Sequence, residues 1–314
     1  MQERLIVPPG SQRRAFPFVV AAIHTRRSTA IDPAGLAEEP VFGPPAASVE
    51  AFLDAARAQV AIELTPLNPS TGEPAISHIR AAFARGMHVV TANKGPLAHA
   101  YADLRAQAAR AGVSFRFESA VMDGAPVFNL WRCTMPAVKL LGFAGALNST
   151  SKIVVEAMER GASPADGLAA ARALGLAEGD GWFDIEGWDS AAKTAALANV
   201  LMDARIRPQE VSTRGIARLT PARAQAIAAQ GKTVRLVSRA KRTASGVRLR
   251  VRAEVLDRAD ILACAPGASN VIVFHTDLMG AFGVVSIDPG IEQTAYGVFS
   301  DLVSLTGPPP SPWL

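Results

Sequence analysis

The chain has 314 residues, of which 49% are hydrophobic and 19% charged, so it can bury the cores of two domains and is not disordered. Its net charge is +4, but the basic residues are scattered without a run of five, which does not support nucleic-acid binding. No window resembles a secretory signal or a membrane span. With only two isolated cysteines, Cys133 and Cys264, the composition predicts a cytoplasmic protein with reduced thiols.

The first part of the chain alternates predicted strands and helices, an order that is typical of a parallel sheet. Its strands are continuous apolar runs, as expected for strands covered on both faces. The predicted elements are a strand over residues 16–25, a helix over 49–58, a strand over 59–66, a helix over 73–86, a strand over 88–95, a helix over 101–112 and a strand over 113–121.

From about Pro126 onward the pattern changes to long helices followed by alternating strands, which predicts a second lobe with a mixed sheet. Its predicted helices cover residues 151–160, 164–174 and 190–202, and its strands cover 246–256, 270–276 and 283–287. A last helix over 292–305 precedes a proline-rich tail.

A dinucleotide-binding sheet opens with a strand, a GxGxxG turn and a helix, and this sequence lacks that turn. The strand over 16–25 resembles the second strand of such a sheet, so we interpret the first βα unit as missing. Arg26 and Arg27 follow this strand, where an acidic residue normally contacts the ribose. They would favour the 2′-phosphate of NADP, although two solvated arginines explain the pattern equally well.

The densest polar cluster lies over residues 174–195, where a glycine-rich acidic segment precedes Lys193. Asp189 and Lys193 are four positions apart and share one face of the predicted helix. Such a pair is usually a surface pair worth about 0.3–0.5 kcal/mol. Here the flanking helix is apolar on nearly every face, and burying an unpaired ammonium there would be costly.

This pattern suits proton transfer coupled to hydride transfer. Reduction of an aldehyde leaves an alkoxide, which a lysine tuned by burial and a neighbouring carboxylate can protonate. Nearby free carboxylates could bind the α-ammonium of an amino-acid substrate. Two further motifs have both structural and functional interpretations. TANKGP is either a simple turn or places Lys94 near the substrate, and GALNSTS opens a helix that Ser149 or Thr150 could cap.

Five segments, in order along residues 16–305, resemble homoserine dehydrogenase: ELTPLNPSTGEPA, HVVTANKGPLA, ESAVMDGAPVFNL, GALNSTSKIVVEAMERG and residues 174–195. The resemblance implies NAD(P)-dependent interconversion of L-homoserine and L-aspartate 4-semialdehyde, in threonine, methionine and isoleucine biosynthesis. It also implies a homodimer. No appended regulatory domain is expected after residue 305.

The fold implied is α/β. An incomplete Rossmann-type nucleotide-binding domain would cover residues 1–125, and an α+β catalytic and dimerisation domain with a mixed sheet would cover 126–290. Residues 291–314 would form a helix that packs back on the first domain, followed by a loose tail.

The resemblance also implies roles for individual residues. Lys193, Asp189 and Lys94 would form the catalytic centre, and Gly175, Glu178 and Asp189 would bind the substrate. The cofactor would contact Thr65, Ala92, Lys94 and Gly290, with Arg26 and Arg27 as further candidates. A sodium ion would be bound largely by backbone carbonyls around Glu118, Val121, Asp123 and Ala125.

Two alternatives stay open. Without the glycine-rich turn, the chain could be a non-catalytic or cofactor-impaired homologue that binds a small amino acid or a partner subunit. It could also be a related reductase for a different amino-acid semialdehyde, because the sequence does not fix the length of the substrate side chain.

Overall fold

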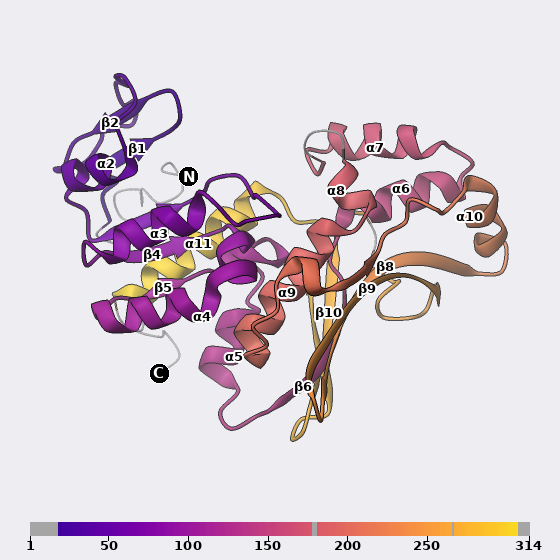
Figure 1. Ribbon diagram of the computed structural model, residues 1–314. Coiled ribbons are helices and arrows are strands. Elements are labelled where there is room, and N and C mark those ends of the chain that lie inside the picture. The colour runs from indigo at the N-terminus through magenta and orange to yellow at the C-terminus, as the bar shows by residue number, and fades with distance from the viewer. Residues whose placement is uncertain (1–17, 178–180, 266, 307–314) are drawn as a thin grey trace, which may run out of the picture.

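The computed structural model describes residues 18–177, 181–265 and 267–306, which form two lobes that meet along the middle of the molecule (Figure 1). One lobe contains a three-stranded sheet and the other a six-stranded sheet. The prediction of an α/β protein with a parallel sheet in one part and a mixed sheet in another is therefore confirmed. No helix in these described ranges is both long and apolar enough to cross a membrane.

The sheet of the first lobe is parallel, with its strands in chain order. It contains β3 (Val60–Glu63), β4 (His88–Thr91) and β5 (Phe115–Arg116), which are connected by α3 (Ala75–Phe83) and α4 (Lys94–Ala111). Neighbouring residues of β4 face opposite ways. Val89 packs in the core with Leu97 of α4, whereas Val90 packs with Val298 and Leu302 of the last helix, α11 (Ile291–Leu305). Helices therefore cover both faces.

The strand predicted over residues 16–25 is wrong, as far as the described residues show. β1 (Ala22–His24) pairs antiparallel with β2 (Thr29–Ile31) in a separate hairpin that precedes α2 (Val49–Ala56). Val19 is 67% exposed, so this apolar run is not buried on both faces. The turn between the strands is closed by the Thr25 amide, which donates to the Ser28 carbonyl at 2.9 Å. An apolar run indicates that a segment is hydrophobic but not which strand it pairs with. Here β1 pairs with β2, the next strand in the chain.

The strand predicted over residues 113–121 is also shorter than expected. After β5 the chain forms two short 3₁₀ helices, η1 (Glu118–Ala120) and η2 (Met122–Gly124). Met122 and Asp123 adopt positive φ values of 59° and 55°, which a strand does not allow. The helix predicted to start at residue 101 begins earlier, at Lys94.

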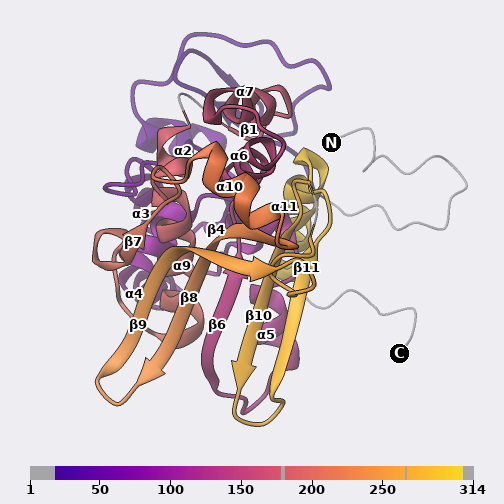
Figure 2. The same cartoon turned by 90° about the vertical axis from the view of Figure 1, so that its right-hand side faces the viewer.

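The sheet of the second lobe has the order β11-β10-β6-β8-β9-β7, and only its β7–β9 pair is parallel (Figure 2). Its strands are β6 (Leu140–Ala146), β7 (Ser212–Arg214), β8 (Lys232–Thr243), β9 (Gly246–Asp257), β10 (Asn270–Thr276) and β11 (Ala281–Ser286). The helical elements of this lobe are α5 (Phe128–Thr134), α6 (Ser149–Glu159), α7 (Pro164–Ala173), α8 (Trp182–Ile185), α9 (Trp188–Met202), η3 (Pro208–Glu210) and α10 (Pro221–Ala228).

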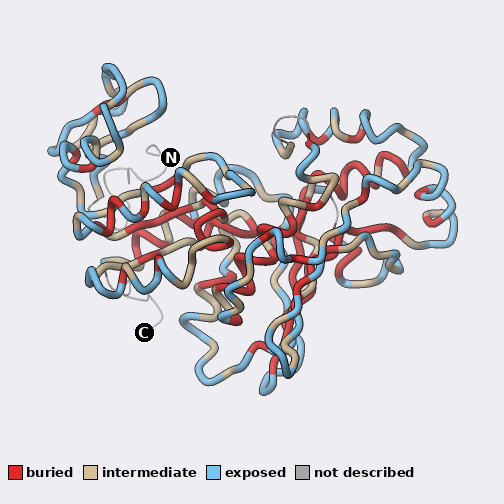
Figure 3. Tube along the Cα trace, in the orientation of Figure 1, coloured by how far each residue is buried: buried red, intermediate tan, exposed pale blue. Residues whose placement is uncertain are grey.

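Helix α9 lies between the two lobes and contacts α4 on one side and β8 and β9 on the other (Figures 1 and 3). This position explains why its sequence is apolar almost all round. The alanines on its middle turns are fully buried: Ala191, Ala192, Ala195, Ala196 and Ala198. Their small side chains let the neighbouring elements approach closely, which brings α4 next to α9.

A buried pair of carboxylates connects α11 to the rest of the molecule. The Glu118 side chain accepts hydrogen bonds from the backbone amides of Phe128 (2.8 Å) and Asn129 (2.6 Å), at the start of α5. The Glu118 amide donates in turn to the Asp301 carboxylate at 2.7 Å. Glu118 is 2% exposed and Asp301 is 1% exposed. Burial raises the pKa of Glu118 from 4.5 to about 7, although the two amide donors act in the opposite direction.

This shift predicts a pH-dependent stability. Glu118 binds its proton more tightly in the folded than in the unfolded chain, so its contribution to stability falls as pH rises from about 4.5 to about 7. The loss is on the order of 3 kcal/mol. In urea unfolding at pH 5 and pH 8, Glu118→Gln is expected to show a smaller decline in stability than the parent. Glu38→Gln, at an exposed site, serves as the control, and equal declines in all three proteins would refute the assignment.

Candidate active site

The carboxyl ends of β3 and β4 are connected through the buried side chain of Glu63. Its carboxylate accepts hydrogen bonds from the Thr91 hydroxyl at 2.7 Å and from the Thr65 amide at 2.7 Å. The Thr65 hydroxyl donates to the same carboxylate. This network fixes the last residue of β4, Thr91, and the segment that follows β3 at the edge where ligands of parallel sheets bind. The sequence interpretation singled out Thr65 but not Glu63, the residue that holds it.

Asn93 sets the position of Lys94. Its side chain caps α4 by accepting from the Gly95 amide at 2.8 Å, and it donates to the Thr65 carbonyl at 2.9 Å. Lys94 is therefore the first residue of α4, at the carboxyl edge of the sheet, and Ala92 lies beside it. TANKGP is a capped helix start, not a simple turn.

Two lysines from different lobes share one carboxylate. Lys94 Nζ of α4 lies 3.2 Å from Asp189 Oδ1, and Lys193 Nζ of α9 lies 3.1 Å from Asp189 Oδ2. Lys193 also donates to the Leu147 carbonyl at 2.7 Å. The three charged side chains are 16–19% exposed. We refer to Lys94, Asp189 and Lys193 as the lysine–aspartate cluster.

The cluster favours the charged forms of Asp189 and Lys193. Burial alone would raise the pKa of Asp189, but the charges of Lys193 and Lys94 outweigh burial and hold that pKa well below its usual range. Burial would lower the pKa of Lys193, but Asp189 and, to a smaller extent, Asp123 outweigh it and raise that pKa. Lys193 is therefore an ammonium at neutral pH.

A second carboxylate lies beside the cluster. The Asn148 side-chain amide donates to Asp184 Oδ1 at 2.6 Å and to Asp189 Oδ2 at 3.0 Å. Burial, followed by repulsion from Asp189, raises the pKa of Asp184 from 3.8 to about 6. Asn148 also caps α6 by accepting from the Ser151 amide at 2.7 Å, so the expectation that Ser149 or Thr150 caps this helix is wrong.

Asn148 was not predicted to belong to the site, and Asp184 was predicted only as one of several carboxylates of the acidic segment. A signal for Asn148 was present, since asparagine before a helical run is a preferred N-cap. Asp184 belonged to the acidic segment, but its distance from Asp189 could not be obtained from spacing alone.

The remaining residues predicted to bind the substrate or the cofactor are exposed or lie outside the described residues. Gly175 is exposed after α7 with φ of 70°, and Gly290 is the exposed residue before α11. Glu178 lies outside the described residues. Arg26 and Arg27 are exposed in the turn between β1 and β2.

Most residues of the segment expected to bind sodium already make hydrogen bonds within the protein. The Glu118 carboxylate caps α5, which leaves its backbone carbonyl for any ion, and Val121 is buried. Asp123 accepts a hydrogen bond from the Asn270 side chain at 3.2 Å. The Ala125 carbonyl accepts from the Val127 amide at 2.7 Å. Within the described ranges, no three His, Cys, Asp or Glu side chains gather to hold a metal.

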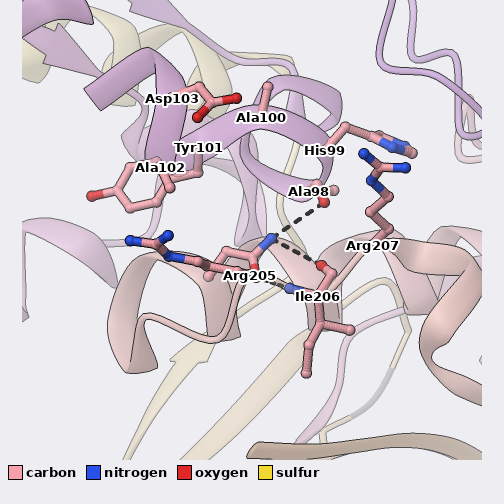
Figure 4. A pocket seen from close by; sticks show the side chains of 10 residues that line it. Ala98, His99, Ala100, Tyr101, Ala102, Asp103, Arg205, Ile206 and Arg207 are labelled. Carbon is pink, nitrogen blue, oxygen red and sulfur yellow. Dashed lines mark hydrogen bonds between the residues drawn. The ribbon is translucent and has the colours of Figure 1, made fainter. Parts of the chain in front are cut away.

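A pocket of about 170 Å³ lies farther along the α4–α9 contact (Figure 4). Its lining includes His99, Tyr101, Arg205 and Arg207, but no member of the lysine–aspartate cluster. We therefore locate the candidate site by its chemistry. A protonated lysine beside a buried carboxylate, at the carboxyl edge of a parallel sheet, can donate a proton to an oxygen that gains negative charge.

Comparison with known proteins gives a consistent result over both lobes. Residues 126–303 match the family model described as "Homoserine dehydrogenase", and residues 9–118 match "Homoserine dehydrogenase, NAD binding domain". A "NAD(+)-dependent homoserine dehydrogenase" of Pseudomonas canavaninivorans is 37% identical over 257 residues, which covers 82% of this chain and 73% of that protein.

Solved structures agree. A homoserine dehydrogenase from Thiobacillus denitrificans is 31% identical with a TM-score of 0.75, over 84% of this chain and 60% of that one. A homoserine dehydrogenase from Thermoplasma acidophilum is 25% identical with a TM-score of 0.81, over 92% of this chain and 90% of that one.

Proposed function

The chain belongs to the homoserine dehydrogenase family of oxidoreductases, and we propose that its lysine–aspartate cluster transfers the proton in the interconversion of L-homoserine and L-aspartate 4-semialdehyde. The observation that carries this proposal is the pair of contacts, 3.1 and 3.2 Å, that joins both lysines to Asp189. The cluster lies between the lobe that matches the NAD-binding family model and the lobe that matches the dehydrogenase model.

Lys193 is proposed as the general acid when the aldehyde is reduced. Its raised pKa keeps a proton on Nζ, and the Leu147 carbonyl and Asp189 orient that ammonium. In the oxidation direction the neutral amine of Lys193 accepts the proton of the substrate hydroxyl. Lys94 places a second positive charge beside Asp189, which keeps the carboxylate ionised in either direction.

Asp184 is proposed to join the substrate-binding residues. Its carboxylate lies beside the cluster through Asn148, and burial followed by repulsion from Asp189 raises its pKa, so a cation bound there would favour its charged form. The α-ammonium of homoserine would supply that cation. Gly175 and Glu178 keep the substrate-binding roles that the family resemblance gives them, as predictions.

The residues at the carboxyl edge of the parallel sheet fit a nicotinamide dinucleotide. Hydrogen bonds of Glu63 and Asn93 hold Thr65, Ala92 and the start of α4 together there, so a ligand would meet a preformed edge. When bound, the nicotinamide supplies or accepts the hydride. Gly290 stays a predicted cofactor contact.

We expect Lys193→Met to lower turnover by about 10²-fold to 10⁴-fold and to abolish the pH dependence of homoserine oxidation. Oxidation of homoserine needs neutral Lys193, whose pKa lies above its ordinary value of 10.5, so the parent's oxidation rate should rise with pH through the range from about 8 to 10. Reduction of the aldehyde needs the ammonium and should stay level over that range. Initial rates of both directions measure this.

Lys139→Met, at an exposed lysine, is the matched control and should keep the parent's rates. Turnover by Lys193→Met within twofold of the parent would refute the assignment. Absence of turnover in the parent with either cofactor would favour the alternative of a cofactor-impaired homologue. A panel of amino-acid semialdehydes tests the alternative of a different substrate length.

Although β1 lies in a separate hairpin and the Pseudomonas relative is named as NAD(+)-dependent, we propose that Arg26 and Arg27, two adjacent exposed cations in the β1–β2 turn, select NADP through its 2′-phosphate. Replacing both with serine should raise the KM for NADP by about 10-fold to 100-fold and leave the KM for NAD within twofold. Arg110→Ser, at an exposed arginine near the end of α4, is the control. A parent that prefers NAD, or equal effects on both cofactors, would show that these arginines are solvated surface residues.

A sodium ion at the carbonyls of Glu118, Val121, Asp123 and Ala125 stays a prediction. Backbone carbonyls are hard oxygen ligands, and the two tight turns at Met122 and Asp123 bend this segment sharply. We expect the melting temperature to be higher in sodium chloride than in choline chloride of equal ionic strength. Equal melting temperatures in the two salts would contradict the predicted sodium site.

Several expectations stay predictions of the family resemblance: the boundaries at residues 125 and 290, the homodimer, the cytoplasmic location and the place in threonine and methionine biosynthesis. The large apolar side chains exposed on β11 and at the start of α11 support an interface there. They include Val285 and Tyr296, which are 48% and 67% exposed.

A further inference from the structure

We propose that Asn199 is a positioning residue that holds the first turn of α4, and therefore Lys94, at its distance from Asp189. This inference rests on the proposed function, because the position of Lys94 affects turnover only if Lys94 acts in the proposed reaction. Asn199 lies in α9, six positions after Lys193, and is 6% exposed. It does not touch the cluster, so its effect must be transmitted through the two helices.

The side-chain amide of Asn199 spans the contact between the lobes. Its nitrogen donates to the carbonyls of Leu97 at 3.1 Å and Ala98 at 3.2 Å, both in α4. It also donates to the Ile206 carbonyl at 3.0 Å, and its oxygen accepts from the Ile206 amide at 2.8 Å. Ala98 and Ile206, whose carbonyls accept these bonds, are labelled in Figure 4.

The carbonyls of α4 that Asn199 contacts do not need its amide as a hydrogen-bond partner. Carbonyls within a helix accept from the amide four residues later, so those of Leu97 and Ala98 have partners in the helix ladder. A helix keeps its geometry without a further donor from outside. The two bonds from Asn199 therefore fix where α4 lies, and the bonds to Ile206 separately stabilise the turn after α9.

The anchored carbonyls lie within one turn of Lys94. Leu97 and Ala98 follow Lys94 by three and four positions, and one helical turn takes about 3.6 residues. Leu97 is 0% exposed and Ala98 is 1% exposed, so this turn of α4 is buried. A shift of this turn would move Lys94 directly and lengthen its 3.2 Å contact with Asp189.

A double-mutant cycle tests the inference, with Asn199→Ala, Lys94→Met and the combined variant assayed for homoserine oxidation at saturating cofactor. If Asn199 acts through Lys94, Asn199→Ala lowers kcat about 10-fold to 100-fold in the parent. In the Lys94→Met background the same change lowers kcat less than about twofold. Equal losses in the two backgrounds would show a general structural role and overturn the proposal.

A second contact between the same helices provides the matched control. Arg105 of α4 lies 3.7 Å from Asp203, the residue after α9, in an exposed ion pair. Arg105→Ala should leave kcat within twofold, and a loss as large as that of Asn199→Ala would overturn the proposal. Where Asn199→Ala melts below the assay temperature, Asn199→Ser gives the same cycle with a hydroxyl donor retained.

The outcomes separate the two proposals. If Lys94→Met turns over at the parent's rate, the role of Lys94 in the proposed function fails, and the positioning role fails with it. If Lys94→Met is impaired but the cycle is additive, the proposed function stands and only the role of Asn199 is overturned.

Discussion

Two ammonium groups within about 3 Å of a single, largely buried carboxylate that is 16% exposed form the constraint on which this structure depends. Removing these charges from water is costly unless each is matched, so the distances within the lysine–aspartate cluster must be kept. Lys94 belongs to the lobe with the parallel sheet, whereas Asp189 and Lys193 belong to the other. The electrostatic requirement of the site is therefore also a requirement on how the lobes dock. The alanines of α9 and the amide of Asn199 meet that requirement with close packing and neutral hydrogen bonds.

The same constraint explains the different proton affinities of the neighbouring carboxyls. Asp189 has two cations in contact, and its pKa is held well below its usual range. Asp184 is also partly buried but has Asp189 as a neighbour, and its pKa is raised to about 6. Asn148 donates to both, so one neutral side chain fixes the separation between a carboxylate that is already matched and one that still needs a positive partner. In the proposed function, that positive partner is the α-ammonium of the substrate.

Local features of the site could be predicted from sequence, whereas contacts between distant segments could not. The spacing of Asp189 and Lys193 fixed their shared helix face, and the apolar surroundings indicated burial. The contact of Lys94 with Asp189 joins residues 95 positions apart, so the sequence could suggest that Lys94 lies near the substrate but not that it contacts Asp189. Asn199 carried no signal, because its partners are backbone carbonyls. The strand expected over residues 16–25 failed for a related reason: apolar content does not specify which strand becomes its partner, and β1 pairs with β2 next to it.

The last helix has a consequence for how the chain acquires its structure during synthesis. Val90, in the central strand of the first lobe, has its partners Val298 and Leu302 in α11, roughly 200 residues later. Glu118 likewise depends on Asp301. The N-terminal sheet therefore emerges from the ribosome with one apolar face bare, and it stays bare until the final helix is translated. Such a long-range closure makes the first lobe slow to mature and exposes it to aggregation in the interval.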